Sequence, residues 1–263
     1  MNLDSLKHIL SPLPLASIHF FEEISSTNVY ALNLLAEQTI CENGTLVIAN
    51  AQTAGRGRFE RKWVTQPGSS LAFTLILSPS AQEAQKNVLF SPLGALSVCM
   101  ALEKMGLSPE IKWPNDVLLD GKKMCGILAE SYWFGQWLKG IVLGIGVNVG
   151  LSSIPPTEAL LFPATCIEAY SQHPVDRIEF LHEVLRYIFL LREEILEDSF
   201  IQAWDKRLAF RGEEVAILQK NSEDIKGVLL GISANGQLRL GITPTKEIEI
   251  LVGDVKLRPM WRN

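Results

Sequence analysis

The chain has 263 residues, of which 47% are hydrophobic and 20% are charged, and its formal net charge is −5. This length and apolar content suffice for one large domain, or for one domain followed by a small one. The acidic balance argues against non-specific binding of nucleic acid, and the sequence has no apolar run long enough to span a membrane.

The cysteines and histidines give no sign of a disulfide framework or of a metal site. The four cysteines lie far apart without a CxxC pair, and the four histidines show no metal-ligand spacing. The cysteines are Cys41, Cys99, Cys125 and Cys166. Isolated cysteines are typical of free thiols in a reducing compartment, and the N-terminus lacks the basic start and apolar core of a signal peptide. We therefore expect a soluble, cytoplasmic protein.

The first part of the chain alternates predicted strands and helices. Pro12 and Pro14 interrupt the residues before the first strand, so we expect neither a helix nor a helix-turn-helix domain there. Apolar periodicity and turn residues predict a strand over 18–21, a helix over about 28–38, and strands over 45–50 and 71–77. The last of these strands is continuously apolar, which indicates burial on both faces.

The helix predicted over 28–38 starts with three polar residues, Ser26, Thr27 and Asn28. Serine and threonine are favoured helix N-caps, and a helix start with several polar side chains can also satisfy the hydrogen bonds of a ligand. From the spacing alone, simple capping accounts for one or two of the three residues and is favoured over ligand binding.

The stretch from Gly55 to Trp63, GRGRFERKW, links two predicted core strands and concentrates positive charge. Glycine lets a backbone approach a ligand closely, and arginine offers a planar charged fork that grips phosphate or carboxylate. In an acidic chain this positive charge is local, which favours a small anionic ligand over a long polyanion. On charge alone, a solvated surface loop is an equally good interpretation.

A predicted hairpin follows a short strand that carries Lys112. The turn residues 114–116 end that strand, and Asp120-Gly121 predicts a tight hairpin turn. Lys122 and Lys123 begin its second strand. Because strand side chains alternate between the two faces of a sheet, one lysine can face water while the other faces a site.

Asn148 is the one polar side chain in an apolar run whose glycines lack the dinucleotide-binding spacing. A buried asparagine needs partners, and bracing the backbone and binding a ligand are equally open roles.

Residues 151–175 are expected to run over the surface, and the short strands after residue 211 suggest a small β-barrel. The remaining predicted elements are helices at about 91–105, 176–196 and 200–208, and strands at 110–113, 128–133, 137–149, 214–219, 225–232, 237–240 and 247–251.

Five segments together resemble biotin protein ligases. They are Ser26-Thr27-Asn28 with Gln52, the loop Gly55–Trp63, KWPND at Lys112–Asp116, KKMCGIL at Lys122–Leu128, and GVN at Gly146–Asn148. A single Gly-Arg-Gly-Arg would be a weak signal. Five segments in the family's order and spacing, from about residue 20 to the end of the chain, are highly specific.

The resemblance implies an α/β (α+β) fold in two domains. The catalytic domain, residues 1–210, would have a mixed sheet with flanking helices, as in class II tRNA synthetases and lipoyl ligases. Residues 211–263 would form a small SH3-like β-barrel. Family members that also repress transcription carry an N-terminal DNA-binding domain, and we expect a ligase of the form without one.

The resemblance also implies an activity. Family members join biotin to ATP as biotinyl-5′-AMP and then transfer the biotin to one lysine of a biotin carboxyl carrier domain, such as that of acetyl-CoA carboxylase. Mg²⁺ would arrive with ATP. No nucleic-acid or membrane partner is implied, and a homodimer is left open.

The resemblance assigns a role to each motif residue. Lys123 and Arg58 are the implied catalytic residues, with Lys123 bridging the biotin carboxylate and the α-phosphate. The implied biotin-binding residues are Ser26, Thr27, Asn28, Gln52, Gly55, Arg56, Gly57, Arg58, Trp63, Lys123 and Gly126. The implied ATP or adenylate residues are Arg58, Arg61, Lys112, Asn115 and Asn148. Asp116 is the implied helper for a metal or for the acceptor amine.

The chain departs from many relatives at Phe59-Glu60, where they have arginine or glutamine followed by glycine. This difference indicates altered closure of the loop, while the anion-binding arginines are retained. The rival interpretations are a lipoyl or octanoyl ligase, an RNA- or protein-binding module, and an inactive homologue that senses biotin.

Overall fold

The computed structural model describes residues 1–37, 42–156, 162–219, 223–251 and 255–259. The larger of the two sheets is a seven-stranded mixed sheet in the order β1-β2-β3-β7-β6-β5-β4. β1 and β2 are parallel, and the other neighbours are antiparallel. The strands are β1 (Ser17–Ile24), β2 (Thr45–Gln52), β3 (Ser70–Leu77), β4 (Pro109–Lys112), β5 (Asp116–Leu119), β6 (Lys122–Phe134) and β7 (Trp137–Asn148).

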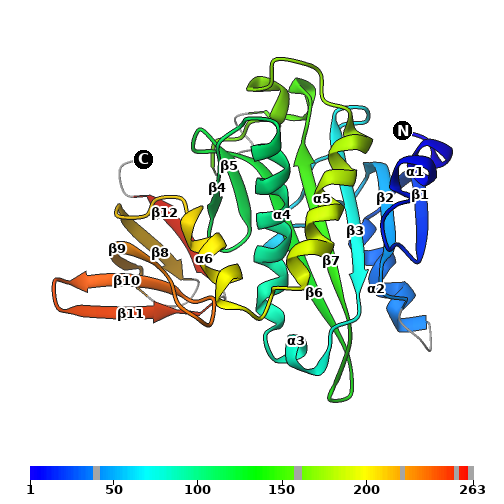
Figure 1. Cartoon of the computed structure of the whole chain (residues 1–263). Coiled ribbons are helices and arrows are strands. Elements are labelled where there is room, and N and C mark those ends of the chain that lie inside the picture. The colour runs from blue at the N-terminus through cyan, green and yellow to red at the C-terminus, as the bar shows by residue number, and fades with distance from the viewer. Residues whose placement is uncertain (38–41, 157–161, 220–222, 252–254, 260–263) are drawn as a thin grey trace.

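Helices cover both faces of this sheet. α4 (Phe90–Lys104) and α5 (Arg177–Arg192) pack side by side on one face, and α2 (Thr27–Glu37) packs on the other against β2, β3 and β7 (Figure 1). β2 shows how one strand serves both layers. Leu46 and Ile48 enter the main core with α4 and α5, whereas Val47 joins a separate cluster under α2. β3 is buried along its whole length, which confirms the prediction from its apolar run.

The C-terminal strands form a second, antiparallel sheet in the order β11-β10-β9-β8-β12. They are β8 (Glu214–Gln219), β9 (Ile225–Ile232), β10 (Leu238–Thr243), β11 (Lys246–Ile250) and β12 (Val255–Pro259). This small sheet lies beside the large one (Figure 1) and fits the expected SH3-like domain. The placement of the domain boundary between residues 210 and 211 stays a prediction.

The remaining helices are α1 (Leu3–Leu10), α3 (Ala81–Gln85) and α6 (Asp198–Lys206). The expectation that no helix precedes the first strand was wrong. Asn2 caps α1 by accepting from the Ser5 amide at 2.8 Å, and Pro12 and Pro14 follow the helix end rather than interrupt it. The sequence also gave no prediction of α3 or β12.

The expectation that residues 151–175 run over the surface was wrong for part of this segment. Thr165, Cys166 and Ile167 are buried. The Lys123 amide donates to the Pro163 carbonyl, and the Thr165 amide donates to the Lys123 carbonyl, both at 2.8 Å. The segment therefore pairs with the start of β6.

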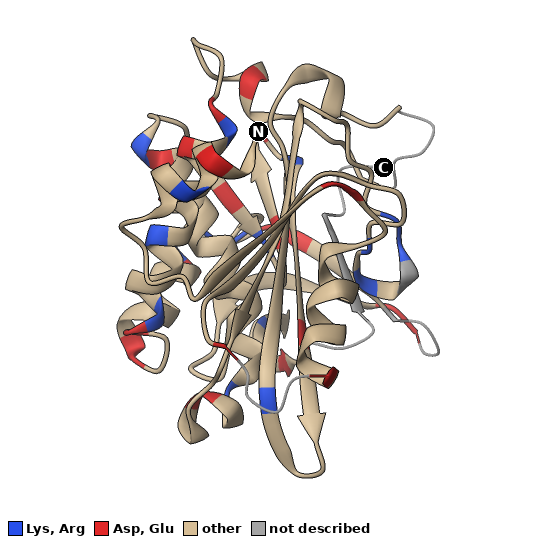
Figure 2. Cartoon of the chain, turned by 90° about the vertical axis from the view of Figure 1, so that its right-hand side faces the viewer, with Lys and Arg blue, Asp and Glu red and all other residues tan. Residues whose placement is uncertain are grey.

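The thiol and membrane predictions can be compared with the described residues. Cys99, Cys125 and Cys166 are free and buried, and burial raises the pKa of the Cys125 thiol. Cys41 lies outside the described residues. Within those residues, no helix has the length and apolarity that crossing a membrane requires. Figure 2 shows basic and acidic segments interspersed along the helices at the left of that view.

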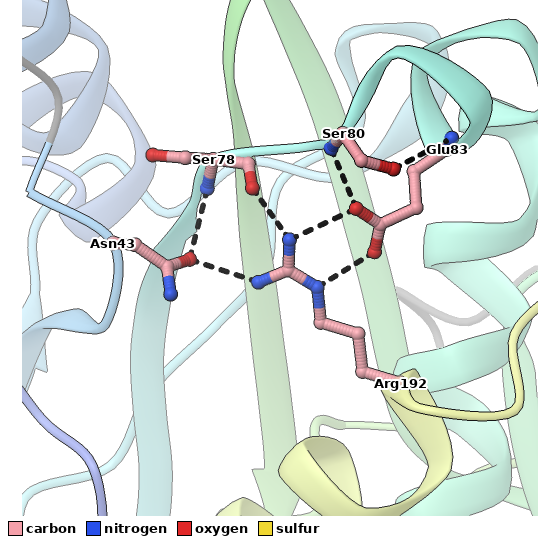
Figure 3. Close-up of polar contacts among 5 residues, drawn as sticks. All are labelled: Asn43, Ser78, Ser80, Glu83 and Arg192. Atoms are coloured by element: carbon pink, nitrogen blue, oxygen red, sulfur yellow. Dashed lines mark hydrogen bonds and ion pairs between the residues drawn. The ribbon is translucent and has the colours of Figure 1, made fainter.

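Arg192, at the end of α5, ties three segments together (Figure 3). Its Nε and Nη2 donate to the two carboxylate oxygens of Glu83 at 2.8 and 3.2 Å, and Nη1 donates to Asn43 Oδ1 at 2.8 Å. Nη2 also donates to the Ser78 carbonyl, and Glu83 accepts from the Ser80 amide. Burial by itself would raise the pKa of Glu83, but the bonds from Arg192 and Ser80 outweigh it and lower that pKa.

We expect Arg192→Met to lower the free energy of unfolding by about 3 kcal/mol near neutral pH, because it leaves the buried Glu83 carboxylate without its cation. The Glu83 pKa is depressed in the folded protein, so this stabilisation exists above the ordinary glutamate pKa and is lost as the pH falls. Urea unfolding of both proteins at neutral and acidic pH measures the difference. Arg239→Met, which removes an exposed ion pair with Glu247, is the control and should change stability little. Equal losses in the two variants would contradict the assignment.

Candidate active site

A cavity of about 140 Å³ lies where the start of α2, the loop 55–63, the β4–β5 turn and the strands β6 and β7 meet. The lining includes most of the residues that the motifs singled out: Ser26, Thr27, Asn28, Gln52, Arg56, Gly57, Arg58, Arg61, Trp63, Lys112, Asn115, Asp116, Lys123 and Gly126. Gly55 and Asn148 are not among the lining residues. Segments far apart in the chain thus converge on one site.

At the start of α2, Thr27 and Gln52 form one hydrogen-bonded unit. The Thr27 amide and hydroxyl both donate to Gln52 Oε1, at 2.8 and 3.1 Å. The backbone N–H of Gln52 donates to Thr65 Oγ1 at 2.7 Å, which fixes the backbone that carries the Gln52 side chain. Ser26 Oγ accepts from the Val29 amide at 3.4 Å, so Ser26 caps the helix as the sequence indicated. Its hydroxyl proton can still be donated elsewhere.

Both the nitrogen and the oxygen of the Asn28 side-chain amide lie within hydrogen-bond distance of protein groups. Its Nδ2 donates to the Leu128 carbonyl at 3.1 Å and to Glu130 Oε2 at 2.8 Å. Thr74 Oγ1 lies 2.7 Å from Asn28 Oδ1 and 2.8 Å from Thr27 Oγ1, and its proton serves one of them at a time. Since a primary amide has two N–H donors, protein groups use both. Asn28 therefore shapes the wall of the cavity, and a direct hydrogen bond from its Nδ2 to a ligand would require displacing one of these partners.

The loop 55–63 is a small hairpin rather than an extended strap. The Trp63 amide donates to the Gly55 carbonyl at 2.9 Å, and the Gly57 amide donates to the Arg61 carbonyl at 2.7 Å. Phe59 sits at the tip with a φ of 58°, in the left-handed region that few non-glycine residues adopt. Such backbone strain is typical of functional loops, and here it lies at the tip of the loop that carries the arginines.

Glycines on β6 and β7 make room for the side chains that form the cavity. A Cβ at Gly146 would lie 2.4 Å from the Trp63 ring, and a Cβ at Gly144 would lie 1.9 Å from Asn28 Oδ1. At Gly126 a Cβ would come within 3.2 Å of the Lys123 amino group and of Trp63. The GIG run on β7 is thus explained by close packing against the site.

Asp116 holds the two lysines of the motifs together. Its Oδ1 lies 2.6 Å from Lys123 Nζ, and its Oδ2 lies 3.4 Å from Lys112 Nζ. Burial by itself would raise the pKa of Asp116, but the charges of Lys123 and Lys112 outweigh it and lower that pKa. The carboxylate therefore stays ionised at neutral pH. Two cations against one anion leave a net positive charge in the cavity, which suits an anionic ligand.

The neighbours of Lys123 fix its position. Lys122 faces away and pairs with Asp120 at 3.5 Å, as the alternation of the strand predicted. The Lys123 backbone is held by the segment 163–165, as described above. Asn148 braces the same segment by donating from Nδ2 to the Thr165 carbonyl at 3.0 Å. Of the two roles left open for Asn148, bracing the backbone is confirmed, and a nucleotide contact stays a prediction.

Arg61 offers a further charged donor at this site. Its Nη2 is buried and has no hydrogen-bond partner among the described residues. A buried guanidinium N–H needs an acceptor, and a phosphate oxygen would supply one.

Comparison with known proteins identifies the family of this chain. The profile of the Biotin/lipoate A/B protein ligase family matches residues 20–148. A biotin–[acetyl-CoA-carboxylase] ligase of Paracoccus denitrificans is 34% identical over 224 residues, which cover 82% of this chain and 90% of that protein. The chain belongs to the biotin protein ligase family.

The fold comparison gives the same family. The biotin protein ligase of Aquifex aeolicus, solved in complex with biotin and ATP, matches with a TM-score of 0.78 and 31% identity, covering 93% of this chain and 100% of that one. The bifunctional ligase/repressor BirA of Bacillus spizizenii is 35% identical over 166 residues. That match covers 63% of this chain and 50% of the relative. The chain therefore spans about half the length of that protein.

Some residues of the site were missed by the sequence reasoning. Thr74 gave a signal, because it is the only polar side chain inside an apolar strand. Gly144 was noticed only as part of a run with the wrong dinucleotide spacing. Glu130 gave no signal, since one acid on a half-exposed strand is ordinary.

Proposed function

We propose that this biotin protein ligase homologue activates biotin with ATP as biotinyl-5′-AMP and transfers the biotin to a specific lysine of a biotin carboxyl carrier domain. This is the reaction of a biotin–[acetyl-CoA-carboxylase] ligase. The observation that carries the proposal is that Lys123, Lys112 and Arg61 line one cavity together with the neutral polar side chains of Ser26, Thr27 and Gln52. In this proposal the charged side chains form an end of the cavity for phosphate, and the neutral ones form an end for an amide-like head.

The neutral end is proposed to bind the biotin head. The ureido group has one carbonyl acceptor and two N–H donors. The hydroxyl of Ser26, the unit of Thr27 and Gln52, and the backbone at Gly55–Gly57 offer complementary groups. Trp63, packed on Gly146, forms an apolar wall for the ring and the valeryl chain.

The charged end is proposed to promote the adenylation step. A biotin carboxylate oxygen attacks the α-phosphorus, the bond from that phosphorus to the bridging oxygen breaks, and pyrophosphate leaves with the electron pair. Negative charge builds where Lys123 Nζ is fixed by Asp116, and fixed cations at such a point lower the barrier. Arg58 is proposed to cover the adenylate, and Lys112, Arg61, Asn115 and Asn148 to line the nucleotide.

In the second step the acceptor lysine amine attacks the acyl carbon, the acyl–phosphate bond breaks and AMP leaves. Lys123 can contact the oxygens of the biotin carboxylate and of the α-phosphate in both steps. The lowered pKa of Asp116 makes it a weak proton acceptor, so we assign Asp116 to orienting Lys123.

Mg²⁺ is proposed to enter as part of magnesium-ATP. The described residues contain no group of three His, Cys, Asp or Glu side chains that could hold a metal ion. Both Asp116 oxygens contact a lysine amino group, which leaves little capacity for a metal. The phosphates of ATP are good Mg²⁺ ligands themselves.

Mass spectrometry of a carrier domain tests the proposed function. The purified chain is incubated with biotin, magnesium-ATP and a biotin carboxyl carrier domain, and the carrier is weighed. We expect a gain of one biotin that requires ATP, and no gain when lipoate replaces biotin. Biotin binding without adenylate or carrier modification would favour the biotin sensor, and lipoate transfer would favour the lipoyl ligase. A carboxylase carrier in the cytoplasm is the proposed partner.

A further inference from the structure

Glu130, on β6, does not itself line the cavity but contacts two residues that do, Arg56 and Asn28. Its Oε1 accepts from Arg56 Nη2 at 3.0 Å, and its Oε2 accepts from Asn28 Nδ2 at 2.8 Å. Arg56 belongs to the loop 55–63, and Asn28 belongs to the first turn of α2. One carboxylate thus joins the arginine loop to the start of α2.

The two contacts differ in exposure, which indicates what they do. The side chain of Arg56 is 45% exposed and that of Glu130 is 22% exposed, so the ion pair lies near solvent, in high dielectric, and contributes little to folding stability. The bond to Asn28 lies deeper, since Asn28 is buried. Glu130 is therefore anchored on the helix side and adds one contact from outside the loop to the hairpin bonds within it.

We propose that Glu130 is a positioning residue that latches the arginine loop over the cavity and so retains the biotinyl-adenylate. This inference rests on the proposed function. Glu130 acts through Arg56 and Asn28 and has no role toward the reacting atoms. Its loss should therefore leave the chemistry of adenylation nearly intact and shorten the time for which the intermediate is held.

Glu130→Gln tests the latch with a minimal change of shape. A glutamine amide has one acceptor oxygen and one N–H₂ group, so in either orientation its nitrogen opposes the donor of Arg56 or of Asn28. We expect biotinyl-adenylate to leave the protein about threefold faster, as loss of one partly exposed ion pair would give. The rate of adenylate formation at saturating biotin should change less than about twofold, and thermal unfolding should be unaltered.

The measurement is the rate at which preformed biotinyl-adenylate leaves the protein. Samples are filtered at intervals to remove the protein, and mass spectrometry measures the biotinyl-adenylate in each filtrate. Glu22→Gln is the matched control. Glu22 is a glutamate on β1 of the same sheet, accepts from Asn50 Nδ2 at 2.6 Å, and does not line the cavity. It should release the intermediate at the wild-type rate.

A double-mutant cycle separates a latch from general loosening. If Glu130 acts on the loop through Arg56, then Arg56→Ala and the double variant Arg56→Ala/Glu130→Gln should release the adenylate at similar rates. Fully additive effects, or wild-type retention by Glu130→Gln, would overturn the latch while leaving the proposed function intact. A wild-type protein that forms no adenylate would overturn the proposed function and this inference together.

Discussion

Lys123→Ala is expected to slow the formation of biotinyl-adenylate by about a hundredfold to a thousandfold, the usual cost of removing one fixed group that stabilises transition-state charge. The fold should persist, because Asp116 keeps Lys112 as a partner and is not left as an uncompensated buried charge. Biotin affinity should fall much less, because the groups proposed for the ureido head, among them Thr27 and Gln52, are held by hydrogen bonds that do not involve Lys123 and stay in place.

A single-turnover assay of pyrophosphate release measures this effect, and isothermal titration with biotin measures binding. Lys122→Ala is the control, since Lys122 is adjacent in sequence but lies on the opposite face with an exposed partner, Asp120. It should adenylate biotin at the wild-type rate. Equal losses in the two variants would point to damage to the hairpin rather than to lost catalysis.

Local features of this ligase homologue were predictable because short-range chemistry determines them. The Asp120-Gly121 turn has positive φ at both residues, 49° and 66°, as an Asp-Gly hairpin requires. The opposite orientations of Lys122 and Lys123 follow from the period of two in a strand. The burial of β3 follows from its apolar run, which Thr74 alone interrupts. In each case, the determining residues are neighbours in the chain.

The motif residues could be grouped only through their resemblance to a family. Periodicity places Thr27, Gln52, Lys112 and Lys123 at the ends of separate elements, and the sheet order β3-β7-β6-β5 then brings those ends together. That order has crossovers that no local pattern specifies. The capping interpretation for the start of α2 was correct for Ser26, and it missed that Thr27 also binds Gln52.

The contacts that could not be predicted join distant residues. Asn28 and Glu130 are 102 positions apart, and Arg56 and Glu130 are 74 positions apart. Each residue by itself has an ordinary explanation as a helix-start amide, a loop cation or a strand acid. The pairing of the segment 163–165 with Lys123 was missed for the same reason, since its proline-rich composition suggested surface loop.

Gly144→Ala is expected to weaken biotin binding by about a hundredfold, because displacing a site by about 1 Å can cost that much. Gly144 lies between Thr74 on β3 and Leu128 on β6 in the sheet register, directly beneath Asn28. A methyl group there would sit 1.9 Å from Asn28 Oδ1, so Asn28 must move. The bonds to Thr74 and Glu130 would then break, and Thr27 and the arginine loop would lose their common support.

Isothermal titration with biotin measures the loss, and the double variant Asn28→Ala/Gly144→Ala identifies its cause. Asn28→Ala removes the atom that the new methyl group meets, so in that background Gly144→Ala should add little. Gly241→Ala, in β10, is the control, because its Cβ would meet Leu230 at an ordinary 3.5 Å. A further hundredfold loss in the Asn28→Ala background would mean that Gly144 contacts the ligand itself. The backbone of Gly144, which lines the cavity, would then bind the ligand directly.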